Sequence, residues 1–401
     1  MIRMSNQSAK RNTRTLAIVG IVIVAIIVGA LGYQAMMPGQ QTATMTSETS
    51  MMTTQTQPPQ PVTILGAGAT FPAPLIQKWT VEYNALNPWV TINYNPIGSG
   101  GGIAQITAKT VDFAGSDAPL NDKQKANITS GVLLLMPETL GGVAVTYNLQ
   151  TYGISNSTTL NFTSDILAGI YMGTITKWND PAITAINPNV NLPDASITAV
   201  HRSDGSGTTY AFTDYLSTVS PEWKAAAGRA TSVKWPVDTA GTGVGAKGNA
   251  GVAGTVFQTP GAVGYVDVIY AAQQHLGIGA VKNPAGNFVL PTIDNIRAAA
   301  AAATGNPDPN NLEMHIVNAS GAQSYPIATY TYILVYKDMS AHPNIDKAKA
   351  EALAKFLWWI VHDGQKYAPD LIYVPLPDNI VKADEALIQS LTYQGTPVYT
   401  P

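Results

Sequence analysis

Residues 201–209 read HRSDGSGTT, and two kinds of secondary structure meet in them. The short apolar run before this segment is typical of a strand, whereas the amphipathic spacing after it is typical of a helix. The strand therefore ends at Arg202, and Ser206, Gly207 and Thr208 open the next helix. The junction supplies a guanidinium, two hydroxyls and helix-start amides within a few residues, a set of groups that suits an anion.

Two earlier junctions have the same design. In residues 66–72, GAGATFP, glycines precede a helix that has Pro72 in its first turn. The backbone N–H groups near Thr70 and Phe71 then lack helical partners. Residues 97–102, IGSGGG, also lead from a strand into a helix. One such turn is more often a tight connection than a ligand site, but in open α/β sheets ligands bind where strands end, and all three turns would lie there.

The rest of the chain from residue 62 onward alternates short apolar runs with longer amphipathic segments. This alternation predicts an α/β fold with largely parallel sheets. The predicted strands are 90–95, 111–116, 133–136, 143–148, 197–201, 262–268 and 327–336, and the predicted helices are 72–86, 101–110, 161–172, 206–218, 250–258, 293–303, 345–362 and 379–391.

Asp117 follows another predicted strand, and two interpretations of it are open. An Asp in this place could cap a helix that starts near Pro119. Alternatively, its carboxylate could accept a proton from a protonated phosphate. Fully ionised sulfate cannot donate that proton, and two buried acceptors would then face each other at a cost of several kcal/mol. The spacing alone does not decide between these interpretations.

The composition excludes several function classes. The chain has 22 Lys and Arg against 25 Asp and Glu, and four of its basic residues precede residue 15. Without those four, 18 basic residues face 25 acidic ones, a net charge of −7 that argues against nucleic-acid binding. The absence of Cys excludes disulfides, thiolate zinc sites and Cys nucleophiles. The scattered His residues form no metal-binding pair, so we expect neither a metal nor a cofactor.

Two segments come close to nucleotide-binding or catalytic motifs without fulfilling them. Residues 243–248, GVGAKG, match G-x-G-x-x-G, but no strong strand precedes them and no Ser or Thr follows the Lys as a P-loop requires. The residues around Ser206 do not fit the G-x-S-x-G pattern of serine hydrolases. The sequence therefore predicts a binding protein rather than an enzyme.

The N-terminal region predicts a position at a membrane. A basic segment, residues 1–15, precedes the uncharged run 16–33, which is long enough to span a bilayer with its basic end in the cytoplasm. A cleaved signal peptide is the alternative. Residues 34–61 are rich in Thr, Ser, Gln and Pro and predict a tether. The body is then anchored on the extracytoplasmic face of the membrane, or it is secreted or periplasmic if the helix is cleaved. Its candidate N-glycosylation sites are Asn127, Asn156, Asn161 and Asn318.

Taken in order, several motifs resemble those of the phosphate-binding protein of high-affinity phosphate ABC importers. They are GAGATFPAPLIQKW, IGSGGGIAQI, VDFAGSDAPL, RSDGSGTTYAFTDYL and PGAVGYV. The resemblance covers the chain from Val62 to its end. It implies a two-lobed periplasmic-binding-protein fold of type II, with phosphate held dehydrated in the cleft between the lobes. Lobe one would comprise residues 62–139 and 326–401, and lobe two residues 140–325. A monomer that serves the permease subunits of an importer is expected.

The resemblance also implies roles for individual residues. Asp117 matches the carboxylate that accepts the phosphate proton, Arg202 the group that pairs with phosphate oxygens, and Asp204 the acid that orients this Arg. The sequence departs from the family pattern at Pro96 and Gly100, and its tether looks more like that of archaeal surface-anchored members. The residues that match amide or hydroxyl donors are Thr70, Phe71, Ser99, Ser206, Gly207 and Thr208.

Three other functions stay open on the sequence. The same fold could bind another oxyanion, namely sulfate, molybdate or tungstate. A phosphate-releasing enzyme would turn over a simple phosphate ester. A structural surface-layer or adhesion protein, suggested by the tether and the sequons, would bind no small anion at all.

Overall fold

The computed structural model describes residues 60–302 and 312–400 of the chain. Contacts divide the chain into Met1–Gln57 and Pro58–Pro401, and every described residue belongs to the second unit. No helix within the described ranges is both long and apolar enough to cross a membrane. Three N-terminal predictions lie outside the described residues: the basic segment 1–15, the membrane or signal helix 16–33 and nearly all of the tether 34–61.

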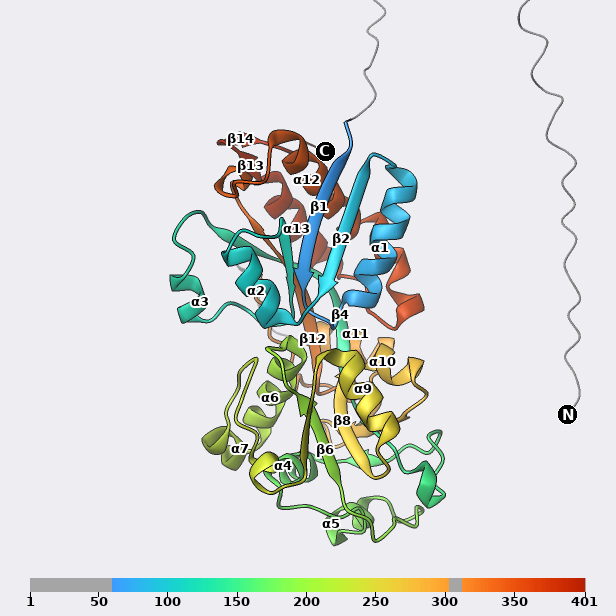
Figure 1. The fold of residues 1–401 in the computed structure, drawn as a ribbon. Helices are drawn as coiled ribbons and strands as arrows, with labels where there is room; N and C mark the ends of the chain where they lie inside the picture. Colours follow the sequence, from blue (N-terminus) through green and yellow to red (C-terminus); the bar gives the residue numbers. More distant parts are fainter. Residues whose placement is uncertain (1–59, 303–311, 401) are drawn as a thin grey trace, which may run out of the picture. The chain divides into compact units, whose positions relative to one another are not determined.

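A mixed sheet runs through this unit (Figure 1). Its strand order is β2-β1-β3-β12-β4-β8-β6-β7. The short strand β9 also pairs with β4 but is not part of this order. β1 is parallel to β2 and β3, and β6 is parallel to β7 and β8. The strands are β1 (Val62–Gly68), β2 (Val90–Pro96), β3 (Phe113–Ser116), β4 (Leu133–Tyr147), β6 (Thr198–Arg202), β7 (Gly243–Ala246), β8 (Ala262–Asp267), β9 (Gly277–Ile278) and β12 (Ala328–Tyr336).

The prediction of largely parallel sheets is wrong at the centre of the sheet. There β12 runs antiparallel to both β3 and β4, and β4 runs antiparallel to β8. Apolar runs show where strands lie but not the direction in which they pair, because pairing joins segments far apart in the chain.

The predicted strands 133–136 and 143–148 are one continuous strand, β4. Pro137 and the glycines after it read as a break in the sequence. The structure places Pro137 at a β-bulge, where the register with β12 shifts and a missing N–H is tolerated. β4 pairs with β12 as far as Gly142 and with β8 from Val143 onward. We call β2-β1-β3-β12 with the first part of β4 the first half-sheet, and the rest of β4 with β8, β6 and β7 the second half-sheet.

Each half-sheet carries its own helices (Figure 1). The eight predicted helices are all present, but 161–172 starts too early because its first two residues form strand β5. Thr163 then caps the helix by accepting a hydrogen bond from Ile166 N. The longer helices are α1 (Ala73–Leu86), α2 (Ser99–Thr107), α4 (Ser164–Met172), α6 (Gly207–Val219), α9 (Gly248–Gln258), α11 (Ile293–Ala302), α12 (Lys347–Val361) and α13 (Asp378–Gln389).

The predicted strand ranges omit β1, β7 and β9, and the sequence predicted none of the remaining elements, which are short. The helices are α3 (Asp122–Ala126), α5 (Pro181–Ile186), α7 (Pro221–Ala226), α8 (Pro236–Thr239) and α10 (Val268–Gln273), and the strands are β5 (Asn161–Phe162), β10 (Ala280–Lys282), β11 (Phe288–Val289), β13 (Thr392–Tyr393) and β14 (Thr396–Pro397).

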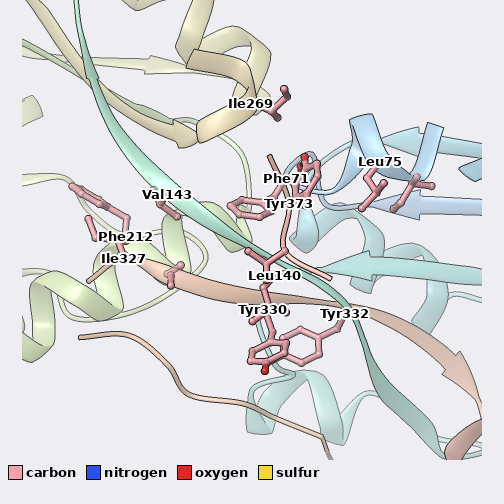
Figure 2. Packing of buried hydrophobic residues seen from close by; sticks show 14 of the residues in the cluster. Phe71, Leu75, Leu140, Val143, Phe212, Ile269, Ile327, Tyr330, Tyr332 and Tyr373 are labelled. Atoms are coloured by element: carbon pink, nitrogen blue, oxygen red, sulfur yellow. The ribbon is translucent and has the colours of Figure 1, made fainter. Parts of the chain in front are cut away.

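One apolar core extends along β4 into both half-sheets. Figure 2 shows Leu140 and Val143 on β4 among buried side chains from distant parts of the chain. Phe71 and Tyr373 pack here with ring centroids 6.2 Å apart. Burying each large side chain contributes about 1.5–3 kcal/mol, so this core fixes the chain junctions that lie beside it.

Candidate anion-binding site

Ser99 joins the two half-sheets at the junctions that the sequence singled out. It is the first residue of α2, follows Gly98 at φ 89°, and is fully buried. Its Oγ accepts hydrogen bonds from Asp117 N at 3.2 Å and from Gly207 N at 3.0 Å. The end of β3 and the start of α6 therefore meet at one hydroxyl.

The backbones also approach each other beside Ser99. Gly100 N donates to Gly205 O at 2.9 Å, and a Cβ on Gly100 would lie 3.1 Å from Gly205 Cα. A residue with a side chain at this position would therefore crowd the opposing loop. The departure from the family pattern at Gly100 fits the close approach that the structure shows.

Thr70 is connected to the second half-sheet by Asn249. Thr70 Oγ1 accepts from Asn249 N at 3.2 Å and from Asn249 Nδ2 at 3.0 Å, and Thr208 Oγ1 also accepts from Nδ2 at 3.1 Å. Asn249 is fully buried, and its Oδ1 accepts from Asp267 N. Since the Thr70 oxygen accepts here, its own hydroxyl hydrogen remains available to a ligand, whereas the Thr208 hydroxyl is directed at Asp117.

Asn249 was missed by the sequence analysis, although a signal for it existed. It is the second residue of α9, directly after the G-x-G-x-x-G segment 243–248. No strong apolar run precedes that segment, but the glycine-rich residues themselves form β7. The motif is a fourth strand-to-helix junction at this site.

Arg202 is held by Asp204 in a two-point ion pair. Arg202 Nε donates to Oδ1 at 2.7 Å and Nη2 to Oδ2 at 2.5 Å, while Gly248 N also donates to Oδ1. Burial opposes ionisation of Asp204, but the hydrogen bonds and charge of Arg202 outweigh it and lower the pKa of Asp204. The side chain of Arg202 is only 1% exposed, and Asp204 holds its guanidinium in place. Asp204 binds Nε and Nη2 but does not bind Nη1.

Asp117 does not cap a helix. α3 begins at Asp122 and is capped by Asn121, whose side chain accepts from Gln124 N. Asp117 is 2% exposed, its Oδ1 accepts from Thr331 Oγ1 at 2.9 Å, and its Oδ2 faces Gly207. The capping interpretation is therefore wrong, and the carboxylate points at the junctions that hold the other predicted residues.

The other predicted residues lie in the same place. Phe71 is fully buried, and its carbonyl accepts from Tyr373 OH. Ser206 caps α6, because its Oγ accepts from Thr209 N at 3.0 Å. Among the described residues, no group of three or more His, Cys, Asp or Glu side chains is placed to hold a metal ion.

A second buried carboxyl, Glu138, lies next to Asp117 and was also missed. Thr331 Oγ1 is 3.1 Å from Glu138 Oε1 and 2.9 Å from Asp117 Oδ1. Burial raises the pKa of Asp117 to about 7, against the hydrogen bond from Thr331 and the charge of Arg202. Burial, helped by the charge of Asp117, raises the pKa of Glu138 to about 8.

These two carboxyls predict a pH dependence of the ligand-free fold. Because their folded pKa values are raised, the folded protein keeps protons that the unfolded chain releases near pH 4. The two protonated carboxyls contribute their whole share of the folding free energy below about pH 4. This share is lost as the pH rises through their folded pKa values of about 7 and about 8. Relative to an Asp117→Asn/Glu138→Gln double variant, we expect the wild type to lose on the order of 2–4 kcal/mol between pH 5 and 8.5. Chemical denaturation of the phosphate-free proteins measures this, and a loss toward acid would contradict it.

The comparisons with known proteins identify the fold and the family. A family model described as a PBP superfamily domain matches residues 53–363. The phosphate-binding protein PstS of Xylella fastidiosa is 44% identical over 325 residues, which cover 81% of this chain and 84% of that protein. The phosphate-binding protein PstS of Methanocaldococcus jannaschii is 38% identical over 336 residues, 81% and 85% of the two chains.

Solved structures of low sequence identity share the fold. The phosphate-binding protein from Stenotrophomonas maltophilia matches with a TM-score of 0.62 at 20% identity, over 81% of this chain and 93% of that one. A high-affinity periplasmic phosphate-binding protein, PfluDING, bound with phosphate matches with a TM-score of 0.63 at 21% identity and the same coverage.

The fold and the site define a solute-binding protein of the PBP superfamily. The chain belongs to the family of the phosphate-binding protein PstS. The family resemblance and the α/β periplasmic-binding-protein fold expected from the sequence are thereby confirmed, whereas the lobe boundaries and the roles of the site residues stay predictions.

Proposed function

We propose that this protein binds inorganic phosphate between two lobes on the extracytoplasmic side and delivers it to the permease of an ABC importer. One observation carries the proposal: Ser99 Oγ binds both Asp117 N and Gly207 N, so that the starts of two helices and a buried carboxylate meet at one point. The relatives named phosphate-binding protein support phosphate as the ligand.

Each group around this point has a proposed task. The helix-start amides and hydroxyls at Thr70, Phe71 and Ser99, and at the start of α6, donate to phosphate oxygens. Arg202 pairs with the anion through Nη1, because Asp204 already holds its other two nitrogens. The binding energy is concentrated in charge-assisted hydrogen bonds within a buried site, where each is stronger than in water.

The proposed lobes follow the two half-sheets. Residues 62–139 and 326–401 form lobe one, and residues 140–325 form lobe two. The change of partner along β4, from β12 at Gly142 to β8 at Val143, supports a crossing in this part of the chain. On this division, the bond from Gly207 N to Ser99 Oγ joins the lobes, so the structure corresponds to a closed state.

Asp117 is the proposed basis of specificity. A phosphate that keeps a proton can donate it to Asp117 Oδ2, whereas sulfate, molybdate and tungstate are fully ionised and would present a second acceptor. Such a buried mismatch costs several kcal/mol, so these oxyanions should bind with lower affinity than phosphate.

Calorimetric titration of the purified protein tests the proposed function. The protein is first stripped of carried-over phosphate by partial unfolding and dialysis. We expect one-to-one phosphate binding, with sulfate at least about a thousandfold weaker, or about 4 kcal/mol. Preferential sulfate or molybdate binding would keep the fold and overturn the ligand, and no binding of any oxyanion would favour a structural role at the cell surface.

We predict that Asp117→Asn reduces the preference for phosphate over sulfate by about a hundredfold or more. An amide can donate to a fully ionised oxygen, so the mismatch with sulfate disappears while the proton of phosphate loses its acceptor. Competition titrations with the two anions measure this ratio. Asp384→Asn changes a buried carboxyl on α13, outside the site, and should leave the ratio unaltered; an unaltered ratio in Asp117→Asn would remove Asp117 from discrimination.

We further propose that the protein is no enzyme, acts as a monomer and is held at the membrane by residues 16–33. Mass analysis of the native N-terminus decides between a retained anchor and a cleaved signal. Among the four sequons, Asn127 is exposed, whereas Nδ2 of Asn156 and of Asn161 donates to a backbone carbonyl. Asn318 is half-buried, so Asn127 is the favoured acceptor if glycans are attached.

A further inference from the structure

Glu138 sits on the β-bulge in the middle of β4. Thr139 pairs with Thr331 and Pro137 pairs with Tyr332, so the residue between them has no partner on β12. Bulges of this kind re-aim a side chain and often lie beside functional sites. Glu138 is fully buried, and its backbone carbonyl accepts from Gln365 Nε2 at 2.9 Å. The bulge thus presents a carboxyl to the interior next to Asp117.

The two carboxyls compete for one hydrogen atom. Thr331 Oγ1 lies within hydrogen-bond distance of both Asp117 Oδ1 and Glu138 Oε1, but a hydroxyl donates only once. If both carboxyls were ionised, one would face the lone pairs of Thr331, and two like charges would be buried on either side of one hydroxyl. One of the pair must therefore hold a proton.

The surroundings assign that proton to Glu138. Asp117 has the charge of Arg202 and a hydroxyl of Thr208 to favour its ionised form. Among the described residues, none is a hydrogen-bond partner of Glu138 Oε2, which is buried. An unpartnered oxygen costs far less as part of a neutral acid than as part of a carboxylate.

We propose that Glu138 is a protonated positioning residue of the phosphate site. Its carboxylic O–H donates to Thr331 Oγ1, and the hydrogen of Thr331 is thereby committed to Asp117 Oδ1. Asp117 is then held ionised and oriented, with Oδ2 left to accept the proton of phosphate. This inference rests on the proposed function, because it concerns which carboxyl of the phosphate site is protonated.

Ionisation of Glu138 would disable the arrangement. The new carboxylate would compete for the hydrogen of Thr331 and add a negative charge beside a bound anion. The titratable groups that face Glu138 are Asp117, at the end of β3, and Tyr94 on β2, whose pKa is raised well above its ordinary value by burial and by both carboxylates. From η3 (Asp363–Tyr367) the neutral Gln365 faces it, so this element offers no cation to offset a charge on Glu138.

The pH dependence of phosphate binding tests the inference. We expect the wild type to lose affinity about tenfold for each pH unit above about 8. In this range the ligand itself stays the dianion, so its own titration does not contribute. Glu138→Leu, which cannot donate to Thr331, should weaken binding about tenfold or more already at pH 7. The conservative Glu138→Gln should restore binding at pH 7 and abolish the loss above pH 8.

Controls separate this inference from the proposed function. Glu351→Gln makes the same chemical change at a partly exposed site on α12 and should keep the wild-type profile. Infrared difference spectra between wild type and Glu138→Gln in the absence of phosphate should show a protonated carboxylic acid at pH 6.5 that is gone at pH 9.5. An equal alkaline loss of affinity in both proteins, or no protonated acid in the spectra, would overturn the inference. A wild type that binds no phosphate overturns the proposed function, and the spectra still report on Glu138.

Discussion

Gly207→Ala is expected to weaken phosphate binding at least a hundredfold without unfolding the protein. A Cβ at this position would lie 2.5 Å from Asp117 Cβ, 2.6 Å from Asp117 Oδ2 and 2.6 Å from Ser99 Oγ. All three atoms belong to the first half-sheet and its helices, whereas Gly207 begins α6 on the second. The added methyl group therefore opposes the approach of the two sides rather than the packing within either.

The expected magnitude follows from the cost of overpacking. Forcing a methyl group into a packed contact costs about 1–3 kcal/mol, and a hundredfold loss in affinity corresponds to about 2.7 kcal/mol. Within α6 the substitution is harmless, since alanine is the better helix former. We therefore expect an unchanged or slightly higher melting temperature in the absence of phosphate.

Gly254→Ala is the matched control for this experiment. Gly254 lies in α9, also on the second half-sheet, and no atom of residues 60–302 and 312–400 lies within 4 Å of the position its Cβ would take. This variant should bind phosphate as the wild type does. Calorimetric titration and thermal unfolding of both variants give the comparison, and full affinity in Gly207→Ala would show that the two sides need not close this far around the anion.

The parts of the site that the sequence predicted are those encoded in short segments. A strand end, a few glycines and a helix start are recognisable within ten residues, so the junctions at Thr70, Ser99 and Arg202 could be found from local signals. The pairing of Arg202 with Asp204, two residues on, is equally local. That these junctions meet in space required only the rule that ligands gather at strand ends.

The parts that the sequence did not predict depend on distant contacts. Asn249 is hydrogen-bonded to Thr70, which is 179 positions away in the sequence. Glu138 is hydrogen-bonded to Thr331, which is 193 positions away. The two predicted strands within β4 are one strand because a bulge absorbs Pro137, and a bulge exists only when the partner strand is known. The direction of pairing at the centre of the sheet was wrong for the same reason.

Arg202→Met is expected to reduce phosphate affinity by about a thousandfold or more. The substitution keeps most of the side-chain volume but removes the guanidinium, whose charge is buried and held in place by Asp204. Truncating one partner of a buried charge pair costs about 2–5 kcal/mol, and here the anion also loses its own charge-assisted hydrogen bond. The carboxylate of Asp204 would then stand unpaired and would repel the phosphate that Arg202 attracted.

Loss of binding must be separated from loss of folding in this case. An unpaired Asp204 destabilises the fold as well, whereas Arg202→Met/Asp204→Asn removes both charges of this ion pair together. We therefore expect the double variant to recover most of the free energy of unfolding and none of the affinity for phosphate. Arg297→Met removes the same group from an exposed ion pair with Asp294 and should change neither quantity measurably. If the double variant regained phosphate binding, the helix-start amides would supply the binding energy. Arg202 would then serve only to neutralise Asp204.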